Sequence, residues 1–126
     1  MTSKCILVVD DDDAIREVAQ TSLELVGGHE VITADCGCDG LARAREDQPD
    51  AILLDVMIPD LDGPATFERL QADPATRHIP VILLTAKLQA SDHARFAELG
   101  MRAVLPKPFD PITLSHEVGQ ILKWSR

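Results

Sequence analysis

The sequence predicts an α/β fold, in which helices cover both faces of a parallel sheet of five strands. The first observation is a set of short apolar runs, because a strand buried on both faces carries apolar residues at successive positions. Four such runs occupy residues 5–9, 51–54, 81–84 and 103–105. The second observation is that segments with helical periodicity separate the runs, and this alternation favours a parallel sheet with right-handed crossovers.

Strands and helices are expected to alternate along the whole chain. Strands are predicted at about 4–9, 30–34, 51–55, 79–84 and 103–106. Helices are predicted at about 13–26, 37–48 and 91–99, with a further one between 62–64 and 73–74 and a last one capped at 110–111. Glycine and proline set several of these limits, because glycine suits a left-handed C-terminal cap and proline suits a first helical turn. The predicted inward faces comprise Ile15, Val18, Ala19, Ser22 and Val26 in the first helix, Leu41, Ala42 and Ala44 in the second, and Ile112, Val118, Ile121 and Leu122 in the last.

Length and composition narrow the class of protein. A chain of 126 residues fits one domain, 1–126. The net charge of −9 disfavours direct binding to nucleic acid or to an anionic membrane surface. No secretion signal or membrane-spanning run is visible, so we expect a cytoplasmic protein without membrane insertion. The 3 cysteines and 4 histidines show no spacing typical of a disulfide framework or a zinc site.

Polar side chains stand at the ends of four predicted strands. Asp10 and Asp11 follow the first apolar run, Asp55 ends the third strand, Thr85 ends the fourth, and Lys107 follows the fifth. Open α/β sheets bind ligands beyond the carboxyl ends of their strands, so these side chains are predicted to form a site. Crowded carboxylates repel one another unless they hold protons or a cation, and oxygen ligands of this kind favour Mg²⁺.

The neighbouring acids Asp12 and Asp13 have a simpler interpretation. Both fall where the first helix is predicted to begin, and the helix dipole favours negative charge at that end. We therefore assign Asp12 and Asp13 to a solvated helix N-terminus, and we keep Asp10 and Asp11 as site residues.

Four short motifs together resemble the receiver domain of two-component response regulators, over essentially the whole chain. They are Val8-Val9-Asp10-Asp11, Asp55 with Pro59 and Asp62-Gly63, Thr85-Ala86, and Lys107-Pro108-Phe109, in the order and at the separations of that family. The resemblance implies a flavodoxin-like, doubly wound sheet with five helices and the strand order 2-1-3-4-5. Strands one and three would then meet at the point where the order reverses and would bring their acids together.

The resemblance also implies a signalling function. Asp55 would accept a phosphoryl group from a sensor histidine kinase, a phosphotransfer protein or a small phosphodonor, and Thr85 and Lys107 would contact the phosphoryl oxygens. Thr85, Ala86 and Val104 would form the switch that changes affinity for an unidentified downstream partner. The chain would therefore be a signalling switch rather than a turnover enzyme.

A magnesium ion is the cofactor that the resemblance implies. Asp11 and Asp55 would bind it directly, together with the main-chain carbonyl of Met57. Asp10 would act through a water molecule or lie just behind these ligands.

Two features, at three positions, depart from the pattern of the family. Val104 stands where many receivers carry a tyrosine or phenylalanine that swings inward on phosphorylation. Met57 and Lys87 flank the expected path of the hydrolytic water, and neither offers a carboxylate or amide to orient it. These departures predict a smaller rearrangement and a longer-lived phosphoryl group.

Several alternatives remain open at this point. Asp10-x-Asp12 after an apolar strand imitates the nucleophile motif of haloacid-dehalogenase phosphatases, which would leave Asp55 unexplained. A calcium-binding loop would need a glycine at its sixth position and a glutamate at its twelfth, and both are missing. A docking module that no longer uses phosphate is disfavoured because every chemical residue is present. A receiver module of a longer regulator with a separate output domain fits the same residues.

Overall fold

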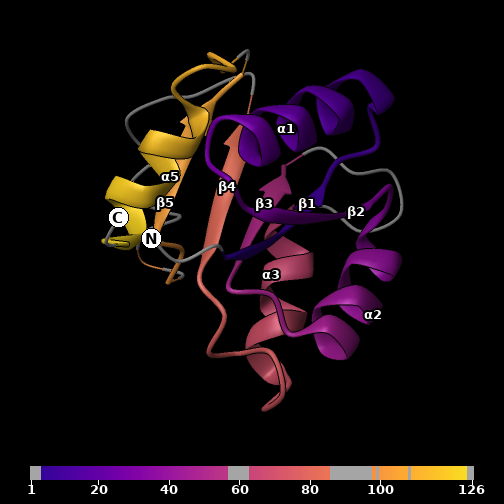
Figure 1. Cartoon of the computed structure of the whole chain (residues 1–126). Coiled ribbons are helices and arrows are strands. Elements are labelled where there is room, and N and C mark those ends of the chain that lie inside the picture. The colour runs from indigo at the N-terminus through magenta and orange to yellow at the C-terminus, as the bar shows by residue number, and fades with distance from the viewer. Residues whose placement is uncertain (1–3, 57–62, 86–97, 99, 108, 125–126) are drawn as a thin grey trace.

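The computed structural model describes residues 4–56, 63–85, 98, 100–107 and 109–124. Within them, helices cover both faces of a five-stranded sheet (Figure 1). The strands are β1 (Cys5–Val9), β2 (Glu30–Ala34), β3 (Ala51–Asp55), β4 (Val81–Thr85) and β5 (Ala103–Pro106). The helices are α1 (Asp13–Leu25), α2 (Gly37–Asp47), α3 (Gly63–Ala72) and α5 (Leu114–Leu122). None of these helices is long and apolar enough to cross a membrane.

The sheet has the strand order β2-β1-β3-β4-β5, and all neighbouring strands are parallel. This arrangement confirms the predicted doubly wound, flavodoxin-like sheet. The predicted fourth helix, 91–99, lies outside the described residues apart from position 98. Val9 pairs with Leu54 and Thr85 with Pro106, so the carboxyl ends of β1, β3, β4 and β5 lie along one edge. The strand order reverses between β1 and β3, and the crevice beyond these strand ends is where such sheets bind ligands.

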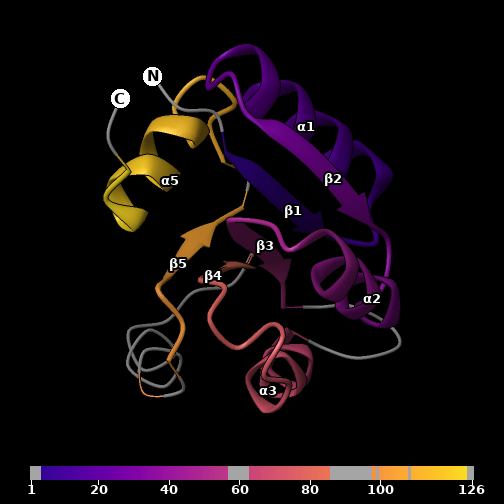
Figure 2. The same ribbon diagram turned by 60° about the horizontal axis from the view of Figure 1, so that its bottom comes forward.

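Two apolar layers enclose the sheet. Successive strand residues point to opposite faces, so Leu7 and Val9 join one layer while Ile6 and Val8 join the other. Figure 2 shows α2 and α3 on one face of the sheet and α1 with α5 on the opposite face. The helices contribute Ala44, Phe67 and Leu70 to the first layer and Ala19, Leu23, Leu114 and Val118 to the second. Burial on both faces explains why the strands read as unbroken apolar runs.

The predicted inward face of α1 is wrong at two positions. Val18 is 39% exposed and Val26, just beyond the helix, is 55% exposed, whereas Leu23 is fully buried. Val18 lies on the same side of α1 as Ser22, whose hydroxyl donates a hydrogen bond to the main-chain oxygen of Pro111, and it lines an open groove there. Val26 follows the last residue of α1, and Leu23 packs into the layer on the sheet.

The predicted inward faces of α2 and α5 each contain one exposed residue. In α2 the contact with β1 is made by Gly40, where an added Cβ would lie 2.9 Å from a methyl group of Val9, and by Ala44. Ala42 lies away from that contact and is exposed. Ile112 is 74% exposed because α5 begins only at Leu114, the first inward residue. The other predicted inward positions of these two helices, Leu41, Ala44, Val118, Ile121 and Leu122, are buried or half-buried against the core.

Candidate functional site

Three carboxylates meet where β1 and β3 end. Asp10 directly follows β1 and is fully buried, and Asp55 is the last residue of β3 and is 4% exposed. Asp11 lies beside them and is exposed to solvent. One carboxylate oxygen from each residue lies within 4.8 Å of the other two. The prediction that these acids share one edge of the sheet is confirmed.

Lys107 supplies positive charge to this cluster. It follows β5, and its Nζ lies 2.7 Å from Asp10 Oδ2 and 2.8 Å from Asp55 Oδ1. Burial by itself would lower the pKa of the ammonium, but hydrogen bonds and charge interactions with Asp10 and Asp55 outweigh it and raise the pKa above its ordinary value. Lys107 is therefore charged, and it offsets one of the two buried negative charges.

The remaining contacts of Asp10 test whether the cluster suits a metal ion. Asp10 Oδ1 accepts the main-chain N–H of Asp12 at 2.9 Å. Asp10 Oδ2 is buried, and apart from the ion pair with Lys107 it has no directed hydrogen bond from the described part of the chain. This oxygen therefore keeps acceptor capacity next to Asp11 and Asp55. An all-oxygen donor set with spare negative charge fits Mg²⁺.

Thr85 and Lys107 are linked through the backbone at the same edge of the sheet. Thr85 is the last residue of β4 and is 6% exposed, and its main-chain oxygen accepts the N–H of Lys107 at 2.8 Å. Val104 lies in β5, where it is half-buried against the layer beneath α2 and α3. The predicted roles of Met57 and Ala86 fall on residues outside the described part of the chain.

The next two acids form the beginning of α1, as predicted. Asp12 is the N-cap, and its carboxylate accepts the N–H groups of Ala14 at 2.9 Å and Ile15 at 3.3 Å. Asp13, in the first turn, pairs with Arg16 one turn later. Both carboxylates are therefore engaged by the helix and its dipole rather than by the cluster.

Sequence reasoning missed Arg16 as a neighbour of the site. Its Nη1 donates to the main-chain oxygen of Asp10 at 2.7 Å, and its side chain is 19% exposed. The guanidinium thus fixes the backbone that carries the first carboxylates and adds positive charge beside them. The only signal in the sequence is its spacing of three residues from Asp13, which is common in helices and specifies no function.

Gly63 was noted in the sequence as part of a helix start, but its importance for the site is visible only in the structure. A Cβ added there would lie 2.7 Å from the main-chain oxygen of Asp55 and 2.9 Å from Val56 Cα. The N–H of Gly63 donates to the oxygen of Val56 at 2.9 Å. A side chain at this position would therefore push α3 away from the backbone that carries Asp55.

Comparisons with known proteins agree with this geometry. The family model described as response regulator receiver domain matches residues 6–119. Response regulator PleD of Caulobacter vibrioides is 41% identical over 119 residues, which cover 94% of this chain and 26% of PleD. Protein PilH of Pseudomonas aeruginosa is 38% identical over 117 residues, which cover 93% of this chain and 96% of PilH.

Solved structures give the same result. The receiver domain of sensor histidine kinase PA1611 from Pseudomonas aeruginosa, solved with a magnesium ion coordinated in its active site cleft, matches with a TM-score of 0.84 and 28% identity. That match covers 97% of this chain and 99% of the other.

The extent of the matches differs between relatives. The chain spans 26% of PleD and 48–50% of two transcriptional regulators, but almost all of PilH. The receiver is thus the part that all of them share, and the match supports a receiver rather than a haloacid-dehalogenase phosphatase. Receivers are signalling switches that take phosphate from histidine kinases. The chain belongs to the response regulator receiver domain family.

Proposed function

We propose that Asp55 is the residue of this receiver that accepts the phosphoryl group. The observation that carries the proposal is the position of the Asp55 carboxylate at the end of β3. It contacts Lys107 Nζ at 2.8 Å, and one of its oxygens lies within 4.8 Å of a carboxylate oxygen of Asp10 and of Asp11. Asp10 is a poorer acceptor, because it is fully buried and its carboxylate already receives the N–H of Asp12. The donor is the phosphohistidine of a sensor histidine kinase or phosphotransfer protein, or a small phosphodonor.

The transfer requires only positioning and charge from the protein. A carboxylate oxygen of Asp55 attacks phosphorus in line, the bond from phosphorus to the donor nitrogen breaks, and its electron pair stays on that histidine nitrogen. The product is an aspartyl phosphate, which carries more negative charge than the carboxylate did. Lys107 is already in contact with Asp55 and offsets this charge, and the Thr85 hydroxyl donates to a phosphoryl oxygen.

The donor set fits a magnesium ion as cofactor. Asp11 and Asp55 would hold it directly through their carboxylates and Met57 through its main-chain carbonyl, while Asp10 would act through a water molecule or lie just behind these ligands. The ion supplies positive charge that offsets the phosphoryl oxygens during transfer. The buried Oδ2 of Asp10, with acceptor capacity to spare, supports this assignment, as does the ion in the PA1611 receiver.

Acetyl phosphate and intact-mass measurement test the acceptor. We expect one phosphoryl group on the parent protein, only in the presence of a divalent cation, and none on Asp55→Asn. Asp13→Asn is the matched control, because Asp13 is an exposed acid of the same strand-to-helix segment that pairs with Arg16 outside the cluster. Stoichiometric labelling of Asp55→Asn would refute the proposal.

We further propose a cytoplasmic switch consisting of one domain, residues 1–126, without direct contact to nucleic acid or membrane. The net charge of −9 and the full-length match to PilH support it. Phosphorylation would shift an existing equilibrium and change the affinity for a downstream protein of the face near β5, α5 and the predicted fourth helix, which lies almost wholly outside the described residues. The alternative is a module of a longer, DNA-binding regulator, which the half-length matches favour. The length of the reading frame separates the two.

The lifetime of the phosphoryl group is a separate part of the proposal. Positioning of the attacking water by a base or orienting group typically contributes about 10²-fold or more to hydrolysis, and Met57 and Lys87 offer neither. We expect slower phosphate loss from the parent than from the double variant Met57→Asn, Lys87→Glu, followed by mass. Faster loss from the parent would contradict the roles given to Met57 and Lys87.

Val104 stands where many receivers carry an aromatic ring that swings inward. Hydrogen exchange of the backbone around Val104 should therefore change little on phosphorylation.

A further inference from the structure

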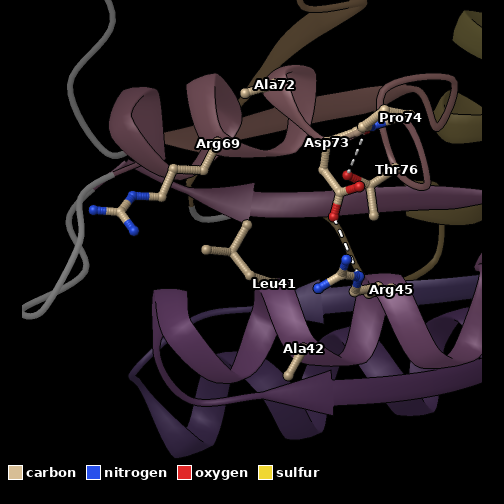
Figure 3. A pocket seen from close by; sticks show the side chains of 8 residues that line it. All are labelled: Leu41, Ala42, Arg45, Arg69, Ala72, Asp73, Pro74 and Thr76. Carbon is tan, nitrogen blue, oxygen red and sulfur yellow. Dashed lines mark hydrogen bonds and ion pairs between the residues drawn. The ribbon is translucent and has the colours of Figure 1, made fainter.

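A groove between α2 and α3 lies on the opposite face of the sheet from α1 and α5, and no step of the phosphoryl chemistry uses it. It has a volume of about 530 Å³, and four apolar and four polar or charged residues line it (Figure 3). The side chains that matter for its chemistry are Leu41, Ala42 and Arg45 from α2, Arg69 and Ala72 from α3, and Pro74. Leu41, Ala42, Ala72 and Pro74 give the groove an apolar surface, and the two arginines add positive charge.

The end of the groove near Arg45 is held by one hydrogen bond between the cap of α2 and the loop after α3, and by one between that loop and α3 itself. Gln48 caps α2 in a left-handed conformation, with φ of 48°, and its amide Nε2 donates to the oxygen of Ala75 at 2.9 Å. The hydroxyl of Thr76 donates to the oxygen of Leu70 at 2.7 Å. The bond of Gln48 links α2 to the loop and the bond of Thr76 links the loop to α3, so the groove is preformed and a ligand loses less entropy on binding.

The charge of the groove is opposite to that of the whole protein. The chain carries a net charge of −9, whereas the groove is lined by two arginines and one acid, Asp73. Arg45 Nε lies 3.5 Å from Asp73 Oδ2, so its charge is already offset. Arg69 has no hydrogen bond or ion pair with any residue of the described chain, and Figure 3 shows its guanidinium extended away from Asp73. Arg69 is therefore available to an anionic group.

We propose that this α2–α3 groove binds an acidic peptide segment of a partner protein, with an apolar side chain in the groove and a carboxylate on Arg69. Guanidinium groups pair with carboxylates in a planar, two-point geometry, which gives such contacts specificity. A nucleic acid fits this groove less well than a short peptide does, because it brings one charge per nucleotide against the net charge of −9, whereas a peptide can present a single carboxylate to Arg69. A second copy of this chain would bring its own net charge of −9 to the contact, which is a larger repulsion than a short peptide meets.

The probe is a short peptide with a central leucine flanked by glutamates, and amide shifts of the ¹⁵N-labelled 126-residue chain report its binding. We expect saturable shifts at residues 41–45 and 69–76 at millimolar peptide. A peptide with lysines in place of the glutamates, or with serine in place of the leucine, should shift these amides much less. Equal shifts with the lysine peptide, or no shifts in these segments, would overturn the proposal.

Variants locate the site within the groove. Arg69→Glu should weaken binding about fivefold or more, as expected for the reversal of one exposed interfacial charge. Arg77→Glu makes the same change of charge at an exposed residue outside the groove lining and should change affinity less than about twofold. Equal loss in both variants would show that only net charge matters and would overturn the proposal.

Two further measurements complete the test. Ala42→Gln places a longer neutral side chain at an exposed helical position of the groove and should also weaken binding, while its circular dichroism and melting temperature stay those of the parent. Sedimentation equilibrium without peptide should give a monomer. A concentration-dependent dimer that shifts the same amides would identify a second copy as the occupant and overturn the proposal of a partner protein.

Discussion

Replacement of Lys107 by methionine tests the electrostatics of the site most directly. The substitution keeps the length of the side chain but removes the ammonium that lies 2.7 Å from Asp10 Oδ2 and 2.8 Å from Asp55 Oδ1. Removal of one partner from a buried ion pair costs about 3–5 kcal/mol, because the remaining charge is left without compensation. Lys107 is 14% exposed and solvent reaches the adjacent Asp11, so we expect the lower end, about 3 kcal/mol.

Thermal and urea unfolding without divalent cations measure this loss. A change of about 3 kcal/mol corresponds to a decrease of roughly 10 °C in melting temperature for a chain of this size. Saturating Mg²⁺ should raise the melting temperature more in Lys107→Met than in the parent, because two buried carboxylates lack compensation in the variant. Lys123→Met is the matched control, since Lys123 is exposed and has no ion pair in the described chain. Equal stability of the two variants would refute the argument that Lys107 offsets the buried acids.

Three other predictions follow from the same structure. Mg²⁺ should raise the melting temperature of the parent, and Asp11→Asn should reduce that increase; no increase at saturating Mg²⁺ would argue against a metal site. Gly63→Ala should lower the free energy of unfolding by about 1–3 kcal/mol, because the added Cβ would press on the backbone of Asp55. Gly119→Ala should instead raise it by about 0.5–1 kcal/mol, because a Cβ there meets no atom within 4 Å and alanine favours a helix. Urea unfolding measures both changes. The pKa of His29 is lowered by burial and, to a smaller extent, by the charge of Lys4. The neutral imidazole therefore contributes fully to stability above the unfolded pKa of 6.5, and this contribution is lost as the pH falls through the folded pKa. His29→Gln should therefore lose less stability than the parent between about pH 7 and pH 5, and equal losses would contradict the assignment.

The sequence predicted the strands and the ends of the strands well, for a physical reason. A strand buried on both faces has a composition that can be recognised locally, and a charged residue directly after it can only lie at the edge of the sheet. Asp10, Asp55 and Lys107 were therefore found without knowledge of any contact. Their mutual contacts depend on the strand order, which residues in one strand cannot specify.

Helix faces and neighbours of the site were harder to predict, because contacts between distant segments determine them. Ser22 is buried beside Pro111, which is 89 residues away, and Val18 lines the open groove next to this contact, whereas Leu23 is fully buried. Arg16 reaches the main-chain oxygen of Asp10 from the first turn of α1, where an arginine has many common surface roles. Neither arrangement has a local signal in the sequence.

The contacts of Lys107 also connect the chemistry to the rest of the sheet. In the structure the ammonium is shared between Asp10 and Asp55, and the N–H of the same residue holds the main-chain oxygen of Thr85 at 2.8 Å. A phosphoryl group on Asp55, as proposed above, would attract the ammonium more strongly than a carboxylate does, so the buried Asp10 Oδ2 would lose part of its compensation.

A cation beside Asp10 and Asp11 would then be more favourable after phosphorylation than before it. Because coupling between two binding events is reciprocal, the same cation favours the phosphorylated form. Lys107 also joins the ends of β4 and β5, since its N–H donates to the main-chain oxygen of Thr85. If Asp55 is the phosphoryl acceptor as proposed, the residue that offsets the charge of the site is therefore also in contact, through its backbone, with the end of β4.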